Sequence, residues 1–148
     1  MRLSPVLIAC VLTIACAAPA AAEVSIGGGV YTSTSPSATG GALLVSTGAS
    51  IPKVPVDIQA TAFFSLVKNG GYAVTGEVRG FTGGGFGGAY FGGGLGVGNL
   101  SSDRSTGPVV TVFGGKSIAP FTAIELRLIK QTATNGATAG FLGLRFSF

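Results

Sequence analysis

The chain has 148 residues, enough for one domain, and its nine Lys and Arg against five Asp and Glu give a formal net charge of +4. The basic residues are scattered along the sequence, so the chain lacks the basic stripe that marks nucleic-acid binding. Only 9% of the residues are charged while 47% are hydrophobic, which is unusual for a soluble domain of this size. No apolar run approaches the length of a membrane-spanning helix.

Residues 1–22 are predicted to be a secretory signal peptide that is cleaved from the mature protein. Arg2 supplies the positive charge near the start, residues 6–18 form the apolar segment, and residues 20–22 are three alanines that suit a cleavage site. The apolar segment is too short to favour a retained membrane helix. The mature chain is therefore expected to start at Glu23 and to form a single domain over residues 23–148.

Both cysteines, Cys10 and Cys16, lie inside this predicted leader. The mature protein would then have no thiol, and hence no disulfide and no cysteine-ligated metal. An alternative interpretation makes residues 13–16 a lipoprotein cleavage box, although Thr13 is a poor residue for its first position.

The mature chain is predicted to form eight strands, because apolar and polar residues alternate with period two between clusters of turn residues. The predicted strands cover residues 23–34, 41–50, 56–66, 72–79, 87–100, 109–115, 121–130 and 138–148. The turns between them are expected at residues 35–39, 51–55, 68–71, 82–85, 101–108, 117–120 and 131–137. Two of these turns contain Asn-Gly, which supplies the positive φ angles of a tight hairpin.

The clearest alternation lies in the third and the last strands. Val56, Ile58 and Phe64 fall on one face of residues 56–66, opposite Asp57 and other polar residues. The last strand ends the chain, and its apolar face carries Leu142, Leu144, Phe146 and Phe148. One face of each strand therefore suits lipid or a core, and the other tolerates water. A transmembrane barrel accounts for the whole pattern, because its apolar residues alternate and never form a long run.

The charged residues in the middle of the strands all fall opposite the apolar faces. Three are acidic and three are basic, and they are Asp57, Glu77, Arg79, Glu125, Arg127 and Arg145. On a lipid-facing surface each would cost about 2–4 kcal/mol near the midplane, whereas inside a barrel they can pair. An eight-stranded barrel is just wide enough for side chains to fill it. The sequence therefore predicts a lumen filled by a charge network that stabilises the barrel.

Four glycines, Gly92, Gly94, Gly96 and Gly98, occupy one face of the fifth predicted strand. Two interpretations are compatible. The glycines either make room for arginines and aromatic rings across the lumen, or they permit the strong twist and coiling of a small barrel.

Catalytic and cofactor sites are not predicted. The chain has no histidine, which removes the usual general base of Ser-His hydrolases and one common metal ligand. The acidic residues lie on separate strands and are matched by arginines, so a tuned carboxylate pair is not expected. Residues 83–88 match a GxGxxG pattern, but a strand follows them instead of the helix that a dinucleotide site needs.

Residues 89–98, 120–127 and 141–148 resemble the small outer-membrane β-barrel proteins related to the OmpA transmembrane domain and the opacity-type porins. The resemblance implies an eight-stranded antiparallel up-and-down barrel in the outer membrane of a Gram-negative bacterium. It also implies that Leu142, Leu144, Phe146 and Phe148 form a C-terminal signal for the barrel-assembly machinery, with periplasmic chaperones acting during biogenesis. Such barrels serve as anchors, adhesins, surface-evasion proteins and minor porins.

An even number of strands places both chain ends in the periplasm, so residues 35–39, 68–71, 101–108 and 131–137 would face outward. These loops are short, which weakens an adhesin role. The outward rim would carry three cations that can contact lipopolysaccharide phosphates, namely Lys68, Arg104 and Lys130.

Three functions remain open from the sequence. The first is an integral outer-membrane barrel with a structural or surface-interaction role and no catalysis. The second is a soluble periplasmic β-barrel or sandwich that binds an apolar ligand, with the apolar face of residues 56–66 turned inward. The third is an enzyme or a conducting channel, which the absence of histidine and a filled lumen both oppose.

Overall fold

The computed structural model describes residues 22–35, 37–51, 53–67, 70–82, 88–100, 105–132 and 136–148. Residues 1–21 of the predicted signal peptide and two of the three predicted lipopolysaccharide contacts, Lys68 and Arg104, lie outside these ranges. Eight strands are present: β1 (Ala22–Thr34), β2 (Ser37–Ser50), β3 (Val56–Ser65), β4 (Tyr72–Thr82), β5 (Ala89–Asn99), β6 (Gly107–Ala119), β7 (Thr122–Gln131) and β8 (Thr138–Ser147). The described part of the chain contains no helix long and apolar enough to cross a membrane.

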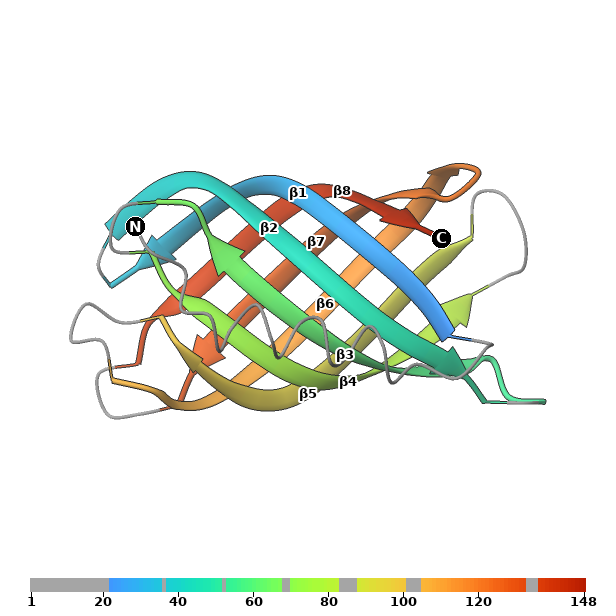
Figure 1. Ribbon diagram of the computed structural model, residues 1–148, viewed down its shortest axis with the longest axis horizontal. Helices are drawn as coiled ribbons and strands as arrows, with labels where there is room; N and C mark the ends of the chain where they lie inside the picture. The colour runs from blue at the N-terminus through green and yellow to red at the C-terminus, as the bar shows by residue number, and fades with distance from the viewer. Residues whose placement is uncertain are drawn as a thin grey trace.

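Each strand pairs antiparallel with the next along the chain, and β8 pairs with β1 to close the barrel. The closing ladder runs from Ser25 opposite Ser147 to Ser33 opposite Ala139. Figure 1 shows the strands winding at a tilt around one common axis, as closure of a small barrel requires. The predicted all-β, eight-stranded, antiparallel up-and-down barrel is therefore confirmed.

The two ends of the barrel differ. One end, called here the loop end, carries the connections β1–β2, β3–β4, β5–β6 and β7–β8. The other, called the terminal end, carries the start of β1, the remaining three connections and the end of β8. At the terminal end the ladder is completed by the backbone of Phe148, which donates to and accepts from Val24.

Several predicted boundaries were wrong at the turns. β2 begins at Ser37, which pairs with Thr34, so residues 37–39 of the expected turn belong to the strand. β6 extends to Ala119, through a bulge between Ser117 and Ala119, into the turn expected at residues 117–120. Backbone hydrogen bonding to the neighbouring strand does not require the apolar alternation on which these boundaries were predicted.

The turn between β6 and β7 consists of Pro120 and Phe121. Phe121 has a φ of 61°, the left-handed region that a type II turn requires after a proline. A bulky residue rarely adopts this conformation. Its aromatic side chain is left 75% exposed at the terminal end.

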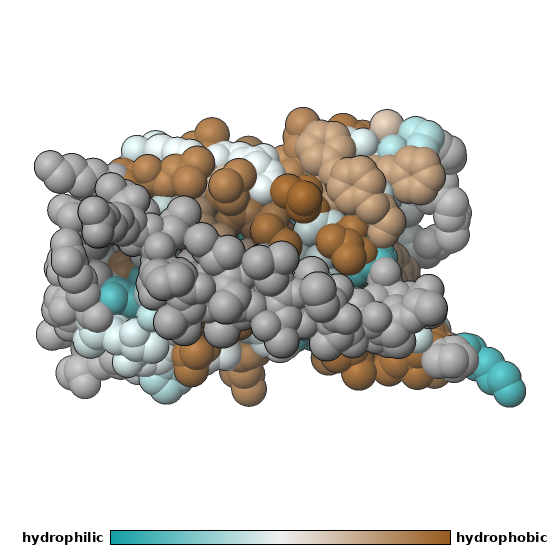
Figure 2. Space-filling model, in the orientation of Figure 1, coloured by the Kyte–Doolittle hydropathy of each residue, from teal (hydrophilic) through white to brown (hydrophobic). Residues whose placement is uncertain are grey.

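A row of apolar side chains on the strands points out of the barrel. Ile58 is 55% exposed, Leu95 69% and Leu126 54%, while Asp57, Glu125 and Arg127 beside them in sequence are almost fully buried. Figure 2 shows hydrophobic residues spread over the visible side wall of the barrel and a hydrophilic tip at one end. The arrangement of a soluble barrel, with the apolar face of residues 56–66 turned inward, is therefore contradicted: Ile58 and its neighbours face outward because the charged alternates occupy the lumen.

Side chains fill the lumen in two regions. Near the loop end, an apolar cluster includes Tyr31, Leu44, Phe63, Ile129 and Phe141. The Phe63 ring lies 5.6 Å from that of Tyr31 and 6.1 Å from that of Phe141, between centroids. Near the terminal end there is a smaller cluster of Tyr90, Phe113 and Ala123. The charged residues lie between and around these clusters.

The glycine face of β5 has both of the effects considered from the sequence. A Cβ added at any of Gly92, Gly94, Gly96 and Gly98 would collide with a backbone carbonyl of β4, so these glycines allow the two strands to coil tightly. At Gly92 and Gly94 it would also meet the side chains of Phe113 and Glu77. The same strip therefore makes room for the lumen's contents at two of its four positions.

Candidate functional site

The candidate site is the set of polar side chains inside the barrel, and Glu77 of β4 lies near its centre. Arg127 of β7 reaches across the lumen and donates to both Glu77 carboxylate oxygens. Gln59 donates from Nε2 at 2.6 Å, Thr61 at 2.8 Å and Thr75 at 2.6 Å. The carboxylate is thus held by one guanidinium and three neutral donors, which compensates its loss of water.

Glu125 of β7 is the second acceptor of the network. It accepts from Arg127 Nε at 3.0 Å, from Arg145 of β8 at 3.1 Å and from the Tyr90 hydroxyl at 2.9 Å. Arg145 also donates to the side-chain oxygen of Gln59 at 2.9 Å. Because Gln59 also contacts Glu77, the two carboxylates and two arginines form one connected network across β3, β4, β7 and β8.

A second group lies closer to the terminal end. Arg79 of β4 donates to Asp57 of β3 at 2.7 Å and to Glu23 of β1 at 2.8 Å. The side chains of Arg79 and Asp57 are 5% and 7% exposed, whereas that of Glu23 is 36% exposed. Arg79 thus bridges one buried carboxylate and one that reaches solvent.

Aromatic rings cover the guanidinium groups. The Arg127 carbon Cζ lies 4.4 Å from the centroid of the Phe113 ring. Arg79 Cζ lies 4.9 Å from the ring of Phe81 and 5.5 Å from that of Tyr90. These contacts are short enough for cation–π attraction, so Arg127 and Arg79 are stabilised on their faces as well as at their edges.

The structure places all six charged residues named from the sequence inside the lumen and joins them by ion pairs. The sequence reasoning missed Glu23, which was treated only as the start of the mature chain. Extending the alternation of β1 back from the buried Ser25 places Glu23 on the inner face. The uncharged hydrogen-bonding residues of the network were also missed, because alternation alone does not identify which side chains contact one another across the lumen.

The network is closed to solvent at its middle. Arg127, Glu77 and Glu125 are each at most 1% exposed. Each of these charges has an opposite charge within hydrogen-bond reach. This arrangement suits stabilisation better than acid-base chemistry, because no carboxylate of this group is left without a cationic partner.

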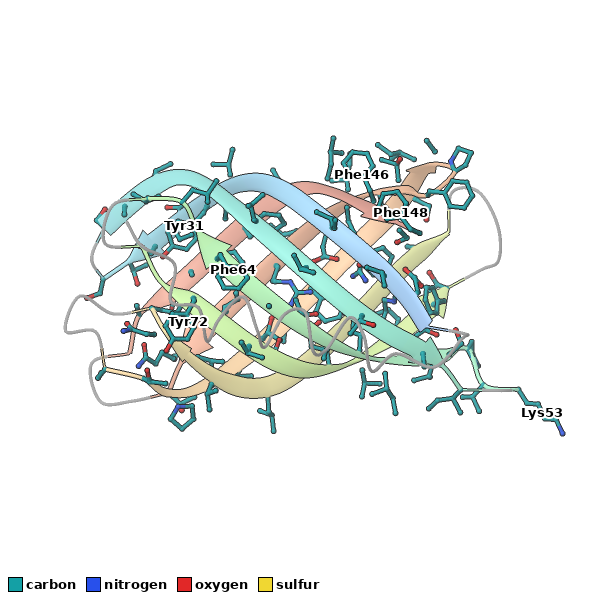
Figure 3. The ribbon with its side chains drawn as sticks, in the orientation of Figure 1. Tyr31, Lys53, Phe64, Tyr72, Phe146 and Phe148 are labelled. Carbon is teal, nitrogen blue, oxygen red and sulfur yellow. The ribbon has the colours of Figure 1, made fainter. Side chains whose placement is uncertain are left out.

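An open cavity of about 390 Å³ lies at the terminal end of the lumen. Glu23, Arg79 and Arg145 line it together with Ser147. Gly115 shapes the space, because a Cβ there would collide with the ring of Tyr90, which also faces the cavity. Figure 3 shows side chains with nitrogen and oxygen atoms gathered inside the barrel between its middle and this end.

The side chains of the predicted assembly signal lie on the outer face of β8 and just beyond it. Leu142, Leu144, Phe146 and Phe148 are 55%, 41%, 41% and 77% exposed. Figure 3 places Phe146 and Phe148 together near the terminal end. Lys130, the one predicted lipopolysaccharide contact inside the described ranges, is exposed on the outer face of β7 near the loop end.

The side chains that the structure describes form no cluster of three or more potential metal ligands from Cys, Asp and Glu. Each carboxylate of the lumen is instead paired with an arginine, at Arg79, Arg127 or Arg145.

Comparison with known proteins gives structural relatives only. No protein-family model matches the sequence, and no curated protein matches it either. Among solved structures, Neisserial surface protein A (NspA) is 16% identical, with a TM-score of 0.62 over 87% of this chain and 98% of that one. The N-terminal β-barrel domain of Pseudomonas aeruginosa OprF is 18% identical, with a TM-score of 0.58 over 85% and 97%.

Two further structures extend the comparison. Ail, the attachment invasion locus protein of Yersinia pestis, is 11% identical, with a TM-score of 0.55 over 86% of this chain and 97% of that one. The outer membrane enzyme PagL is 13% identical, with the same TM-score over 84% and 98%. At these identities the likeness concerns the fold alone: the chain is a closed eight-stranded barrel that resembles small outer-membrane proteins of Gram-negative bacteria.

Proposed function

We propose that this protein is an integral outer-membrane barrel with a structural or surface-interaction role and without catalysis. The observation that carries the proposal is the reversed polarity of the barrel, with apolar side chains outside and ion pairs inside. A wall of this kind is not stable in water, because exposed apolar patches of such extent mark contact with lipid or protein.

The distribution of outward charge supports a membrane-spanning band. Among the described strand residues, the outward-facing charged side chains are Lys116 of β6, towards the terminal end, and Lys130 of β7, towards the loop end. Between these levels the outer face of β7 carries Ile124, Leu126 and Leu128, each more than 40% exposed. Lysines at the margins of an apolar band can extend their amines to the lipid headgroups.

The outer membrane is the membrane we propose, because closed barrels satisfy every backbone group without water and the solved relatives are outer-membrane proteins. The predicted signal peptide is consistent with export. We also propose that the chain is related to OmpA-like or opacity-type barrels and that its loop end faces the outside of the cell.

We further propose that the lumen network is structural. Its residues are buried and mutually paired, and histidine, the commonest general base, is absent from the sequence. PagL shows that an enzyme can share this fold. Lipid hydrolysis by the purified protein would therefore overturn the non-catalytic part of the proposal.

The outer leaflet is the proposed partner at the loop end. Lys130, which is exposed on β7, is proposed to contact a lipopolysaccharide phosphate. Lys68 and Arg104 are proposed to act with it on sequence grounds alone. Changing all three to Gln should lower the heat stability of the barrel in lipopolysaccharide but not in neutral detergent. Equal stability in both media would remove this part of the proposal.

The outward apolar face of β8 is proposed to guide assembly into the membrane. Changing Phe148 to Ser should reduce the amount of folded protein in the outer membrane without changing the lumen. Normal amounts of folded protein in that membrane would contradict an assembly role for this residue.

Cell fractionation followed by gel mobility with and without boiling tests the location and the barrel together. A band in the outer-membrane fraction that shifts on boiling would support a stable membrane-embedded barrel. A soluble periplasmic protein without a shift would contradict the proposal.

A further inference from the structure

The cavity at the terminal end is amphipathic, unlike the closed network above it. Phe81, Phe121 and Phe148 provide apolar walls, while Arg79 and Arg145 provide cationic groups. Phe121 and Phe148 are 75% and 77% exposed, so the apolar part opens towards solvent at this end. Its volume of about 390 Å³ falls at the small end of the range for ligand pockets, which is about 300–1,000 Å³.

The two arginines of the cavity have donor capacity left. The Nε atoms of Arg79 and Arg145 are buried and have no hydrogen-bond acceptor among the described residues. The middle arginine, Arg127, differs, since its Nε donates to Glu125. A guanidinium binds carboxylates through paired donors, so Arg79 and Arg145, which line the cavity, are the groups that an acceptor on a ligand would engage there.

The partners of Arg79 are unequal. Asp57 is buried beside it, whereas Glu23 is 36% exposed and lies at the second residue of β1. Glu23 is therefore the solvent-accessible member of the pair and the one that can exchange, since the side chain of Arg79 is 5% exposed. Glu23 therefore occupies a position on Arg79 that a carboxylate from outside can take over while the Glu23 side chain turns into water.

We propose that this cavity binds a small carboxylate-bearing amphiphile whose carboxylate replaces that of Glu23 on Arg79. The apolar body of the ligand contacts Phe81, Phe121 and Phe148. Exchange of one carboxylate for another leaves the charge around Arg79 unchanged. A phosphate dianion would instead add negative charge beside Asp57, and a two-chain phospholipid is too large for the space.

The probe for this site is decanoate labelled with ¹³C at its carboxyl group, followed by NMR with the mature barrel folded in zwitterionic micelles. A saturable shift beyond that in empty micelles is expected for decanoate. Decanol, which has no charge, and decyl phosphate, which has a larger one, should compete weakly. Decanoate that behaves as it does in empty micelles would overturn the proposal.

Variants of the two acids and the arginine locate the binding. Glu23→Gln removes the internal competitor and should tighten decanoate binding about fivefold, as expected when the competent fraction of a site rises. Glu23→Asp retains the charge but shortens the side chain, and it should also tighten binding if displacement is the cause. Unchanged affinity in both variants would contradict displacement of Glu23.

The double variant Asp57→Asn with Arg79→Gln removes one charge of each sign and so avoids leaving a buried ion unpaired. It should abolish saturable decanoate binding while retaining the mobility shift on boiling that reports a folded barrel. Lys130→Gln, at the opposite end, is the matched control and should bind as the parent does. Undiminished binding by a folded double variant would place the ligand elsewhere and overturn the assignment.

Discussion

The half of the lumen near the loop end is packed with apolar rings, whereas the half near the terminal end is filled by ion pairs and opens into a cavity. Near the loop end Phe63 contacts the rings of Tyr31 and Phe141 within the apolar cluster. Towards the terminal end the aromatic residues contact charged groups, since Tyr90 donates a hydrogen bond to Glu125 and the Phe113 ring covers the guanidinium of Arg127.

This difference shows two ways to fill the same barrel. Apolar packing stabilises the folded barrel because it removes apolar surface from water, and this stabilisation does not depend on the direction of the contacts. Buried ion pairs gain little net stability when complete but are costly to break, because the remaining charge stays buried. The charged half is therefore expected to be more sensitive to single substitutions that change charge, and the apolar half to those that change volume.

The largest effect is expected from Arg127→Glu in the charged half. This change places a third carboxylate beside Glu77 and Glu125 and should lower the free energy of unfolding by about 5 kcal/mol. The urea midpoint of the folded barrel measures it. Lys130→Glu, an exposed reversal on the same strand, is the control and should change stability by about 0.5 kcal/mol or less. An unchanged midpoint for Arg127→Glu would mean that Arg127 faces water.

In the apolar half, Phe63→Ala should cost about 3–4 kcal/mol, because it leaves a cavity between two aromatic rings. Phe63 is 1% exposed, so little relaxation is available. The matched control is Phe91→Ala, since Phe91 is 61% exposed on the outer face of β5. Equal losses of urea stability in the two variants would contradict the difference between lumen and wall.

The close contact of β4 and β5 is tested by Gly96→Ala. The added Cβ would meet the carbonyl of Val74 and the Thr75 backbone, so a loss of about 1–3 kcal/mol is expected from overpacking. At Gly114 of β6 the same Cβ would lie 3.5 Å from the nearest atom, the carbonyl oxygen of Tyr90. Gly114→Ala should therefore be close to neutral, and similar urea midpoints for the two variants would argue against tight coiling at β5.

The smallest effect concerns a single hydroxyl. Tyr90→Phe removes the 2.9 Å hydrogen bond to Glu125 and should cost about 1.5 kcal/mol, since the acceptor is charged and buried. Tyr72→Phe removes an exposed contact with Thr106 and should cost less than about 0.5 kcal/mol. Thermal unfolding of both variants measures the two losses of stability. A larger loss of stability for Tyr72→Phe than for Tyr90→Phe would contradict this prediction.

The fold and the inward direction of the charged side chains could be predicted from the sequence, because both depend on the two-residue period of a strand. A residue between two outward apolar residues, such as Arg127 between Leu126 and Leu128, must face inward in a barrel. Pairing partners were beyond this reasoning. Glu77 and Arg127 lie on β4 and β7, which are not neighbours in the sheet, and only side-chain length and lumen width bring them together.

The cavity was also beyond prediction from the sequence. It depends on how Tyr90 fits against Gly115 and on where the first residues of β1 meet the end of β8. Strand ends were misplaced for a related reason, since β6 continues to pair with β7 as far as Ala119 through a bulge that alternation does not reveal. Alternation reports the environment of side chains, whereas these features follow from backbone geometry and from contacts across the barrel.

We propose that the outer wall of the barrel contacts lipid, while polar groups are kept inside the barrel or at its ends. Spin labels attached to cysteines at Leu126, in mid-strand, and at Lys53, in the β2–β3 turn, test it in nanodiscs. In a membrane-embedded barrel the label at position 126 should collide with oxygen in preference to a water-soluble nickel complex, and the label at position 53 should do the reverse. Free access of the nickel complex to position 126 would contradict the membrane-embedded barrel.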